Sequence, residues 1–220
     1  MIAVLGRPRV YRIGPDGPLA PGGLAAEIAL ALGQESAAVE LVGSIGDDPE
    51  GDRVVVELSR AGVGHAALLR DPATRTPGLR AMVVQRPLPR LEAADVELGL
   101  RYLAECRVLV VAEALDPAAL AEALAAAEYH GAAVVLVAPA GSIDPETLGD
   151  SVTLLERPAA DGITTEEEAT GPGDEARGPG DEATFAGFVA EYALRLDRGE
   201  TPSQAFSAAL GEGAWEPSPG

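Results

Sequence analysis

The stretch of sequence that decides the fold is VELVGSIGDDPEG, residues 39–51 of the 220-residue chain. Its aliphatic start, Val39–Val42, predicts a strand. Gly46 and Gly51 supply the backbone angles that a tight turn needs, and Asp48 stands directly before a proline, which is typical of a helix start. The stretch therefore predicts a strand, a turn and a helix in direct succession, the repeating unit of α/β proteins.

The same alternation continues in both directions along the chain. Besides Val39–Val42, the short aliphatic runs predicted to be strands are Ile2–Leu5, Leu79–Val84, Val108–Ala112, Val134–Ala138 and Val152–Leu155. Apolar residues at helical spacing predict helices that contain Leu24, Ile28 and Leu32; Val54, Leu58 and Ala61; and Leu120, Leu124 and Ala127. Apolar strands separated by helices predict a mostly parallel sheet that is covered on both faces.

Several helix ends are marked by capping residues. Asp116 and Asp144 each precede a proline, so each is expected to cap the N-terminus of a helix. Gly131 is expected to end one helix. Thr201 and Gln204 have the spacing of a capping box, which predicts a final helix.

The last third of the chain has a different composition. Residues 161–184 are acidic, rich in Gly and Pro and almost free of apolar side chains, which predicts a mobile loop. They contain a tandem near-repeat, GPGDEAR followed by GPGDEAT. An amphipathic helix is predicted after the loop, from the spacing of Phe185, Phe188, Val189, Tyr192 and Leu196. We expect one domain over residues 1–220, with this loop inside it.

Composition excludes several classes of function. The net charge is −19, which repels nucleic acid and anionic membranes, so neither is an expected partner. The chain has no lysine, which excludes Schiff-base catalysis and a Walker-type phosphate-binding lysine. Cys106 is the only cysteine, so neither an internal disulfide nor a thiolate metal site is expected. The N-terminus does not resemble a signal peptide, and the chain is expected to be cytoplasmic.

Four stretches, taken in order, resemble a known family. They are IAVLG at 2–6, PGGLAAEIALALG at 21–33, VGSIGDDPEG at 42–51, and the pair TGPGD at 170–174 and GPGD at 178–181. In this order they resemble the signatures of the PfkB/ribokinase family of carbohydrate kinases, of which this chain resembles a shortened, divergent member. The resemblance implies a three-layer α/β/α ribokinase-like fold with a mostly parallel central sheet. Only Arg7–Pro21 joins the first strand to the Gly-Gly segment, so the family's β lid is expected to be reduced or absent.

The resemblance also implies where phosphoryl transfer from ATP would occur. The aspartate of the last signature acts as the base in the family, and backbone N–H groups of its glycine loop stabilise the transferred group. That signature occurs twice here, so the candidate bases are Asp181 and Asp174. The corresponding phosphate- and nucleotide-binding candidates are Gly171, Gly173, Gly178 and Gly180. Proline replaces the usual alanine in both copies, which removes one N–H donor.

The positions that would hold the substrate depart from the family pattern. The implied sugar-binding candidates are Gly22, Gly23, Glu27 and Tyr11. Glu27 stands where the family usually has an asparagine, and Tyr11 stands where it usually has an aspartate. The family's Asn-x-x-Glu motif, which organises metal and phosphates, has no counterpart at residues 155–160, so no metal ligand is assigned.

Two hypotheses about function remain open at this stage. In the first, the chain is a pseudokinase-like binding or interaction module with impaired or lost phosphotransfer and no cofactor. In the second, it is an active kinase that uses ATP and Mg²⁺ to phosphorylate a hydroxyl of a sugar or a nucleoside. Exposed sheet edges invite pairing, so a homodimer is expected under either hypothesis.

Overall fold

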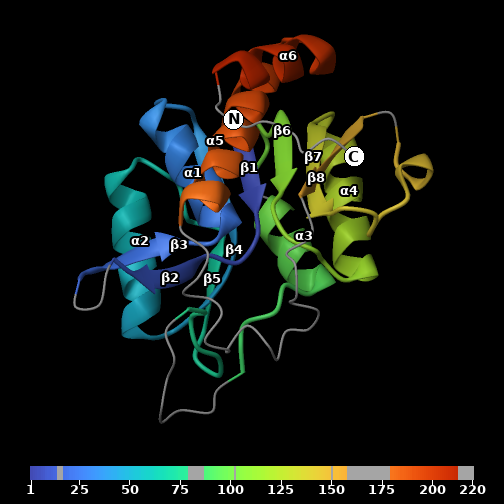
Figure 1. The fold of residues 1–220 in the computed structure, drawn as a ribbon. Helices are drawn as coiled ribbons and strands as arrows, with labels where there is room; N and C mark the ends of the chain where they lie inside the picture. The colour runs from blue at the N-terminus through green and yellow to red at the C-terminus, as the bar shows by residue number, and fades with distance from the viewer. Residues whose placement is uncertain (14–16, 79–86, 102, 150, 158–178, 213–220) are drawn as a thin grey trace.

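The computed structural model describes residues 1–13, 17–78, 87–101, 103–149, 151–157 and 179–212 (Figure 1). Its central sheet has six parallel strands in the order β5-β4-β1-β6-β7-β8. The strands are β1 (Ile2–Leu5), β4 (Val39–Gly46), β5 (Leu68–Asp71), β6 (Val108–Val111), β7 (Ala133–Pro139) and β8 (Val152–Arg157). The expectation of a mostly parallel central sheet is confirmed.

Helices cover both faces of this sheet. The helices are α1 (Leu24–Gln34), α2 (Pro49–Arg60), α3 (Ala93–Arg101), α4 (Pro117–His130), α5 (Pro179–Asp197) and α6 (Pro202–Glu212). Apolar side chains of α1, α2, α5 and α6 form one core with one face of the sheet, and those of α3 and α4 form a second core with the other face. The predicted three-layer α/β/α arrangement is therefore confirmed (Figure 1).

The first strand shows why aliphatic runs serve as central strands here. Ile2 and Val4 belong to the core beneath α1 and α5, whereas Ala3 and Leu5 belong to the core beneath α3 and α4. Side chains alternate between the two faces of a strand, so a strand buried on both faces needs an unbroken apolar sequence. All four residues are fully buried.

The strand that decides the fold is longer than predicted. β4 continues to Gly46 because Gly43–Gly46 pair with Leu68–Asp71 of β5. Glycine at 43 also allows a close approach to the end of β1, since a Cβ placed there would lie 2.2 Å from the carbonyl oxygen of Gly6. The predicted turn and helix follow directly, but neither Gly46 nor Gly51 has the positive φ that favours glycine. Glycine is needed at both positions for close packing, because a Cβ on Gly46 would lie 2.6 Å from the backbone nitrogen of Thr76 and one on Gly51 would lie 2.4 Å from the carbonyl oxygen of Gly46. The Asp48 side chain accepts a hydrogen bond from the backbone N–H of Gly51 at 2.8 Å and so caps α2.

A short antiparallel hairpin joins β1 to α1. It consists of β2 (Arg9–Arg12) and β3 (Leu19–Gly22), with Tyr11 opposite Ala20. This two-stranded sheet lies beside α2 in Figure 1. It agrees with the expectation of a reduced lid, although neither strand was predicted individually.

Other helix ends follow the predicted caps. The Asp116 side chain accepts from the backbone N–H of Ala119 at 2.8 Å, and Gly131 ends α4 in a left-handed conformation with φ 65°. Thr201 and Gln204 form the predicted capping box before α6. Asp144, however, precedes only a single turn of 3₁₀ helix, η1 (Pro145–Thr147), and not an α-helix.

Three further expectations need correction or lie outside the structure. The loop predicted over residues 161–184 ends earlier, because residues 179–184 form the first turns of α5. The buried stripe of α4 consists of Ala119, Ala123 and Ala127, whereas the leucines named from the sequence are only partly buried. The predicted strand 79–84 lies outside the described residues.

Among the helices of the described residues, none has both the length and the apolar composition needed to cross a bilayer.

Candidate functional site

The strand order reverses direction between β1 and β6. From β1 the chain moves outward to β4 and β5, and it then returns to the other side of β1 as β6. In open α/β sheets, ligands bind beyond the carboxyl ends of the strands at such a reversal. The residues that directly follow β1 and β6, Gly6 and Ala112, therefore mark the candidate site.

An ion pair bridges this reversal point. The Arg7 Nε atom donates to the Glu113 carboxylate at 2.9 Å and 3.1 Å, and Arg7 Nη1 donates to the carbonyl oxygen of Pro89 at 3.0 Å. The side chains of Arg7 and Glu113 are each 21% exposed. The pair thus ties the end of β1 to the end of β6 and to the segment before α3. Sequence reasoning missed both residues, because nothing in either local sequence indicates the other.

The Gly-Gly segment lies at the start of α1, against the hairpin. A Cβ placed on Gly22 would lie 2.5 Å from the Tyr11 ring, and one on Gly23 would lie 3.1 Å from Cγ of Arg9. Gly23 also has φ 77°, a conformation that favours glycine. The structure therefore brings three predicted substrate-binding residues together, and the ring of one, Tyr11, packs against another, Gly22.

The fourth predicted substrate-binding residue, Glu27, belongs to the first turn of α1, on the side of that helix near α5. Its Oε2 atom is buried and has no hydrogen-bond partner. Burial, and then the charge of Glu182 in the first turns of α5, raise the pKa of Glu27 to about 7. The positive ends of nearby helix dipoles act in the opposite direction, by up to about 1 kcal/mol at such positions. Glu27 thus has a carboxyl group whose charge the fold disfavours.

The second copy of the glycine-aspartate signature adjoins the start of a helix. α5 begins at Pro179, so Gly180 and Asp181 lie in its first turn, where backbone N–H groups lack intrahelical acceptors. Pro179 has no N–H group to offer. Gly171, Gly173, Asp174 and Gly178 lie outside the described residues.

A second carboxylate at the same edge of the sheet has a very different environment. Asp48 Oδ1 accepts from the hydroxyl of Thr76 at 2.6 Å as well as from Gly51, and Oδ2 accepts from the backbone N–H of Thr76 at 2.7 Å. Partial burial acts to raise the pKa of Asp48, but the hydrogen bonds from Thr76 and Gly51 and the charge of Arg70 outweigh it, and the pKa is lowered. Thr76 was not predicted from sequence.

Within the described part of the chain, no three His, Cys, Asp or Glu side chains converge as the ligands of a metal ion would.

Comparison with known proteins identifies the family. The family model described as pfkB family carbohydrate kinase matches residues 11–168, which is more than half of the chain. The chain belongs to the pfkB family of carbohydrate kinases. No curated protein matches the sequence as a relative.

Solved structures agree with this family at the level of the fold. A protein named Sa239 has a TM-score of 0.60 and 14% identity, over 99% of this chain and 95% of its own. A fructokinase from Halothermothrix orenii has a TM-score of 0.59 and 14% identity, over 97% of this chain and 98% of its own. An uncharacterized sugar kinase from Pyrococcus horikoshii, in complex with ATP, has a TM-score of 0.51 and 13% identity, over 87% of this chain but only 60% of its own. The pfkB-family chain thus has the ribokinase-like fold.

Proposed function

We propose that this pfkB-family chain is a binding or interaction module in which phosphoryl transfer is impaired or lost. One observation carries the proposal: the Glu27 carboxyl group, with its buried and partnerless oxygen, faces Glu182 beside the start of α5. The family asparagine at this position can donate a hydrogen bond, whereas an ionised glutamate can only accept one.

The charge at the start of α5 also opposes the binding of phosphate. Helix N-termini attract phosphate through free N–H groups and the helix dipole, which is how α5 would hold a transferred phosphoryl group. Two carboxylates beside that terminus repel the same group, at a cost of about 1 kcal/mol for each contact at 4 Å in water and more in a protein interior. Pro179 further removes one of the free N–H groups.

The described residues do not fit a magnesium nucleotide. Mg²⁺ at a kinase site is usually held by one or two carboxylates together with the phosphates. The carboxyl groups at this site whose side chains the structure describes include Glu27, whose ionised form is disfavoured, and the exposed Glu182. No residue of the described chain replaces the missing Asn-x-x-Glu motif with a convergent set of ligands. We therefore assign no reaction step to ATP and Mg²⁺.

Calorimetry and an activity assay test the proposal together. We expect no saturable heat when ATP and Mg²⁺ are titrated into the protein, and no phosphoryl transfer to a panel of sugars and nucleosides. Glu27→Asn removes the disfavoured charge and should strengthen any weak nucleotide binding about fivefold, equivalent to about 1 kcal/mol. Glu128→Gln on α4, across the sheet, is the control and should change nothing. Tight Mg²⁺-dependent binding with turnover of any sugar would contradict the proposal.

A second candidate function is an active kinase that phosphorylates a hydroxyl of a sugar or a nucleoside. It is favoured by the position of the second Gly-Pro-Gly-Asp copy, whose Asp181 lies in the first turn of α5, as a catalytic base at a helix N-terminus would. If turnover is found, replacing both Asp174 and Asp181 by Asn should abolish it. Unchanged phosphoryl transfer in the double variant would eliminate both residues as the base.

We also propose that a second copy of the chain covers the β8 edge of the sheet. Among the described strands, β8 pairs only with β7. A hollow of about 500 Å³ runs along it, lined in part by Leu148, Val152 and Leu154. An open strand edge beside apolar side chains is a surface that pairing would protect. Light scattering should give the mass of a dimer, and a monomer at high concentration would contradict this proposal.

A further inference from the structure

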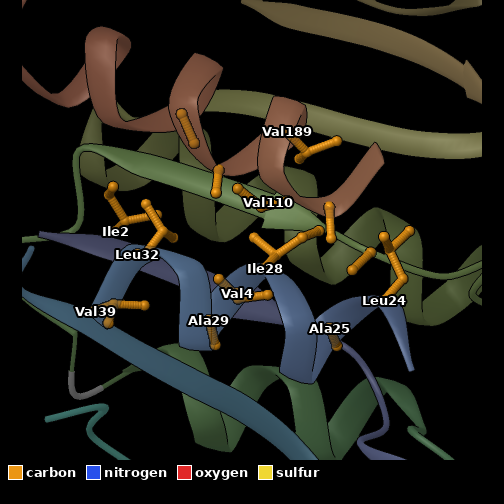
Figure 2. Close-up of a cluster of buried hydrophobic side chains, with 14 of the residues drawn as sticks. Ile2, Val4, Leu24, Ala25, Ile28, Ala29, Leu32, Val39, Val110 and Val189 are labelled. Atoms are coloured by element: carbon orange, nitrogen blue, oxygen red, sulfur yellow. The ribbon is translucent and has the colours of Figure 1, made fainter. Parts of the chain in front are cut away.

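The first turns of α5 lie beside α1, and among their residues whose side chains the structure describes, none before Phe185 is buried. Glu182, Ala183 and Thr184 are exposed, and Phe185 is the first buried side chain of the described part of this helix. Further along, the two helices share an apolar layer, in which Ile28 and Val189 lie over Val110 of β6 (Figure 2). The hydrophobic effect therefore secures α5 from Phe185 onward but contributes little before it.

Glu27 and Glu182 are the charged groups that face each other across this weakly anchored contact. β1 and β3, which also pack against α1, contain no charged residue. Arg9 of β2 lies with its stem against Gly23, and its side chain is exposed.

Three of the other charged groups on elements that contact α1, one each from β4, α2 and α5, have other partners. Glu40 of β4 accepts from the backbone N–H of Ala67. Arg53 of α2 donates to the carbonyl oxygen of Leu19 and pairs with Glu57, and Arg195 of α5 pairs with Glu191 and Glu200. The buried oxygen of Glu27 receives no hydrogen bond from any of these described groups.

We propose that a proton on Glu27 controls the docking of the first turns of α5 onto α1. When Glu27 is neutral, its buried oxygen carries no net charge and Glu182 meets no like charge, so the first turns stay docked. When Glu27 is ionised, an unpaired buried charge faces a second carboxylate, and the apolar contacts that begin at Phe185 do not reach far enough to hold the first turns. These turns then separate from α1 and fray, which returns the buried oxygen of Glu27 to water and separates it from Glu182.

The direction of the effect follows from the pKa of Glu27, which is raised to about 7 from an ordinary value of 4.5. A carboxyl group with a raised pKa favours the docked state when protonated and disfavours it when ionised. Docking should therefore weaken as the pH rises from about 4.5 to about 7 and should change little above it. The first turn of α5 contains Gly180 and Asp181, so the position of the second glycine-aspartate signature would depend on this proton.

Amide hydrogen exchange of the protein without nucleotide tests this inference, so its outcome is independent of the proposed function. The N–H groups of residues 183–187 donate to carbonyls in the first turns of α5, and they exchange when those turns fray. After correction for the intrinsic pH dependence of exchange, their protection factors should fall about threefold to tenfold between about pH 6 and about pH 8. Amides near Val189 should keep their protection.

Two variants separate the effect of Glu27 from general charge effects. In Glu27→Gln, which keeps the side-chain shape, the protection of residues 183–187 should be independent of pH and equal to or above that of the wild type at about pH 6. Glu128→Gln, on the opposite side of the sheet, should retain the wild-type pH dependence.

A second measurement avoids reliance on any variant. The carboxyl ¹³C resonance of Glu27 in the wild-type protein should titrate near neutral pH. The same pH dependence in wild type and Glu27→Gln, or a Glu27 resonance that titrates at its ordinary value, would overturn the inference.

Discussion

Two carboxyl groups at the same edge of the sheet, each at the start of a helix, have opposite environments. Asp48, before α2, receives three hydrogen bonds from Gly51 and Thr76, and its pKa is lowered. Glu27, in the first turn of α1, has a buried oxygen without a partner, and its pKa is raised to about 7. The fold uses the charge of Asp48 and opposes the charge of Glu27. A carboxylate at a helix start is therefore structural only when donors surround it.

The largest effect should come from removing the well-bonded carboxylate. Asp48→Ala leaves the cap of α2 and two donors of Thr76 without their acceptor, and it should lower the free energy of unfolding by about 3 kcal/mol. Urea denaturation measures the loss. Asp47→Ala is the matched control, because Asp47 is exposed and forms only an ion pair with Arg70, and it should cost less than about 0.5 kcal/mol. Equal losses in the two variants would mean that the three hydrogen bonds of Asp48 stabilise the fold no more than the surface ion pair of Asp47 does.

A smaller effect of opposite sign is expected at Glu27. A carboxyl group whose folded-state pKa is raised destabilises the fold as the pH rises from about 4.5 to about 7. Glu27→Gln should therefore stabilise the protein by about 1 kcal/mol at about pH 8, after allowance for partial exposure, and should have little effect at about pH 4. Denaturation at both pH values gives the two differences. A stabilisation that does not vary with pH would mean that the pKa of Glu27 is the same in the folded and unfolded states.

The smallest effect tests how far the low pKa of Asp48 depends on charge. Arg70 pairs with Asp47 and Asp52 on the surface and adds to the field at Asp48. Because these groups are exposed, Arg70→Ala should cost about 0.3 kcal/mol, and this cost should disappear in high salt. Denaturation at low and high ionic strength measures both values. A loss comparable to that of Asp48→Ala would show that charge, and not the hydrogen bonds, holds the turn.

Local sequence predicted most of the sheet because a strand buried on both faces has a nearly continuous aliphatic sequence. β1 matches its predicted bounds, and β6, β7 and β8 differ by one or two residues at an end. β5 was missed because its sequence, LLRD, has only two apolar residues. The β2–β3 hairpin was missed because Arg, Pro and Gly interrupt the apolar pattern that marks strands.

The environment of the candidate site could be predicted only in part. The Gly-Gly segment and Glu27 were identified because they stand in a family signature, and the structure places Tyr11 against Gly22. The repulsion between Glu27 and Glu182, like the Arg7–Glu113 ion pair, acts between residues that are far apart in sequence. Such contacts depend on how α1, α5 and the strands pack. Local periodicity carries no information about that packing.

The one thiol of the chain, Cys106, can serve as a probe of the layer formed by α3 and α4. It lies between α3, α4 and β6, it is 5% exposed, and burial raises its pKa. Alkylating reagents attack the thiolate. While α3 and α4 are packed on the sheet, burial therefore protects this cysteine in two ways: it keeps the reagent out and it disfavours the thiolate. Pulsed alkylation therefore reports when α3 and α4 separate from the sheet, whereas the carboxyl groups discussed above report on the opposite face.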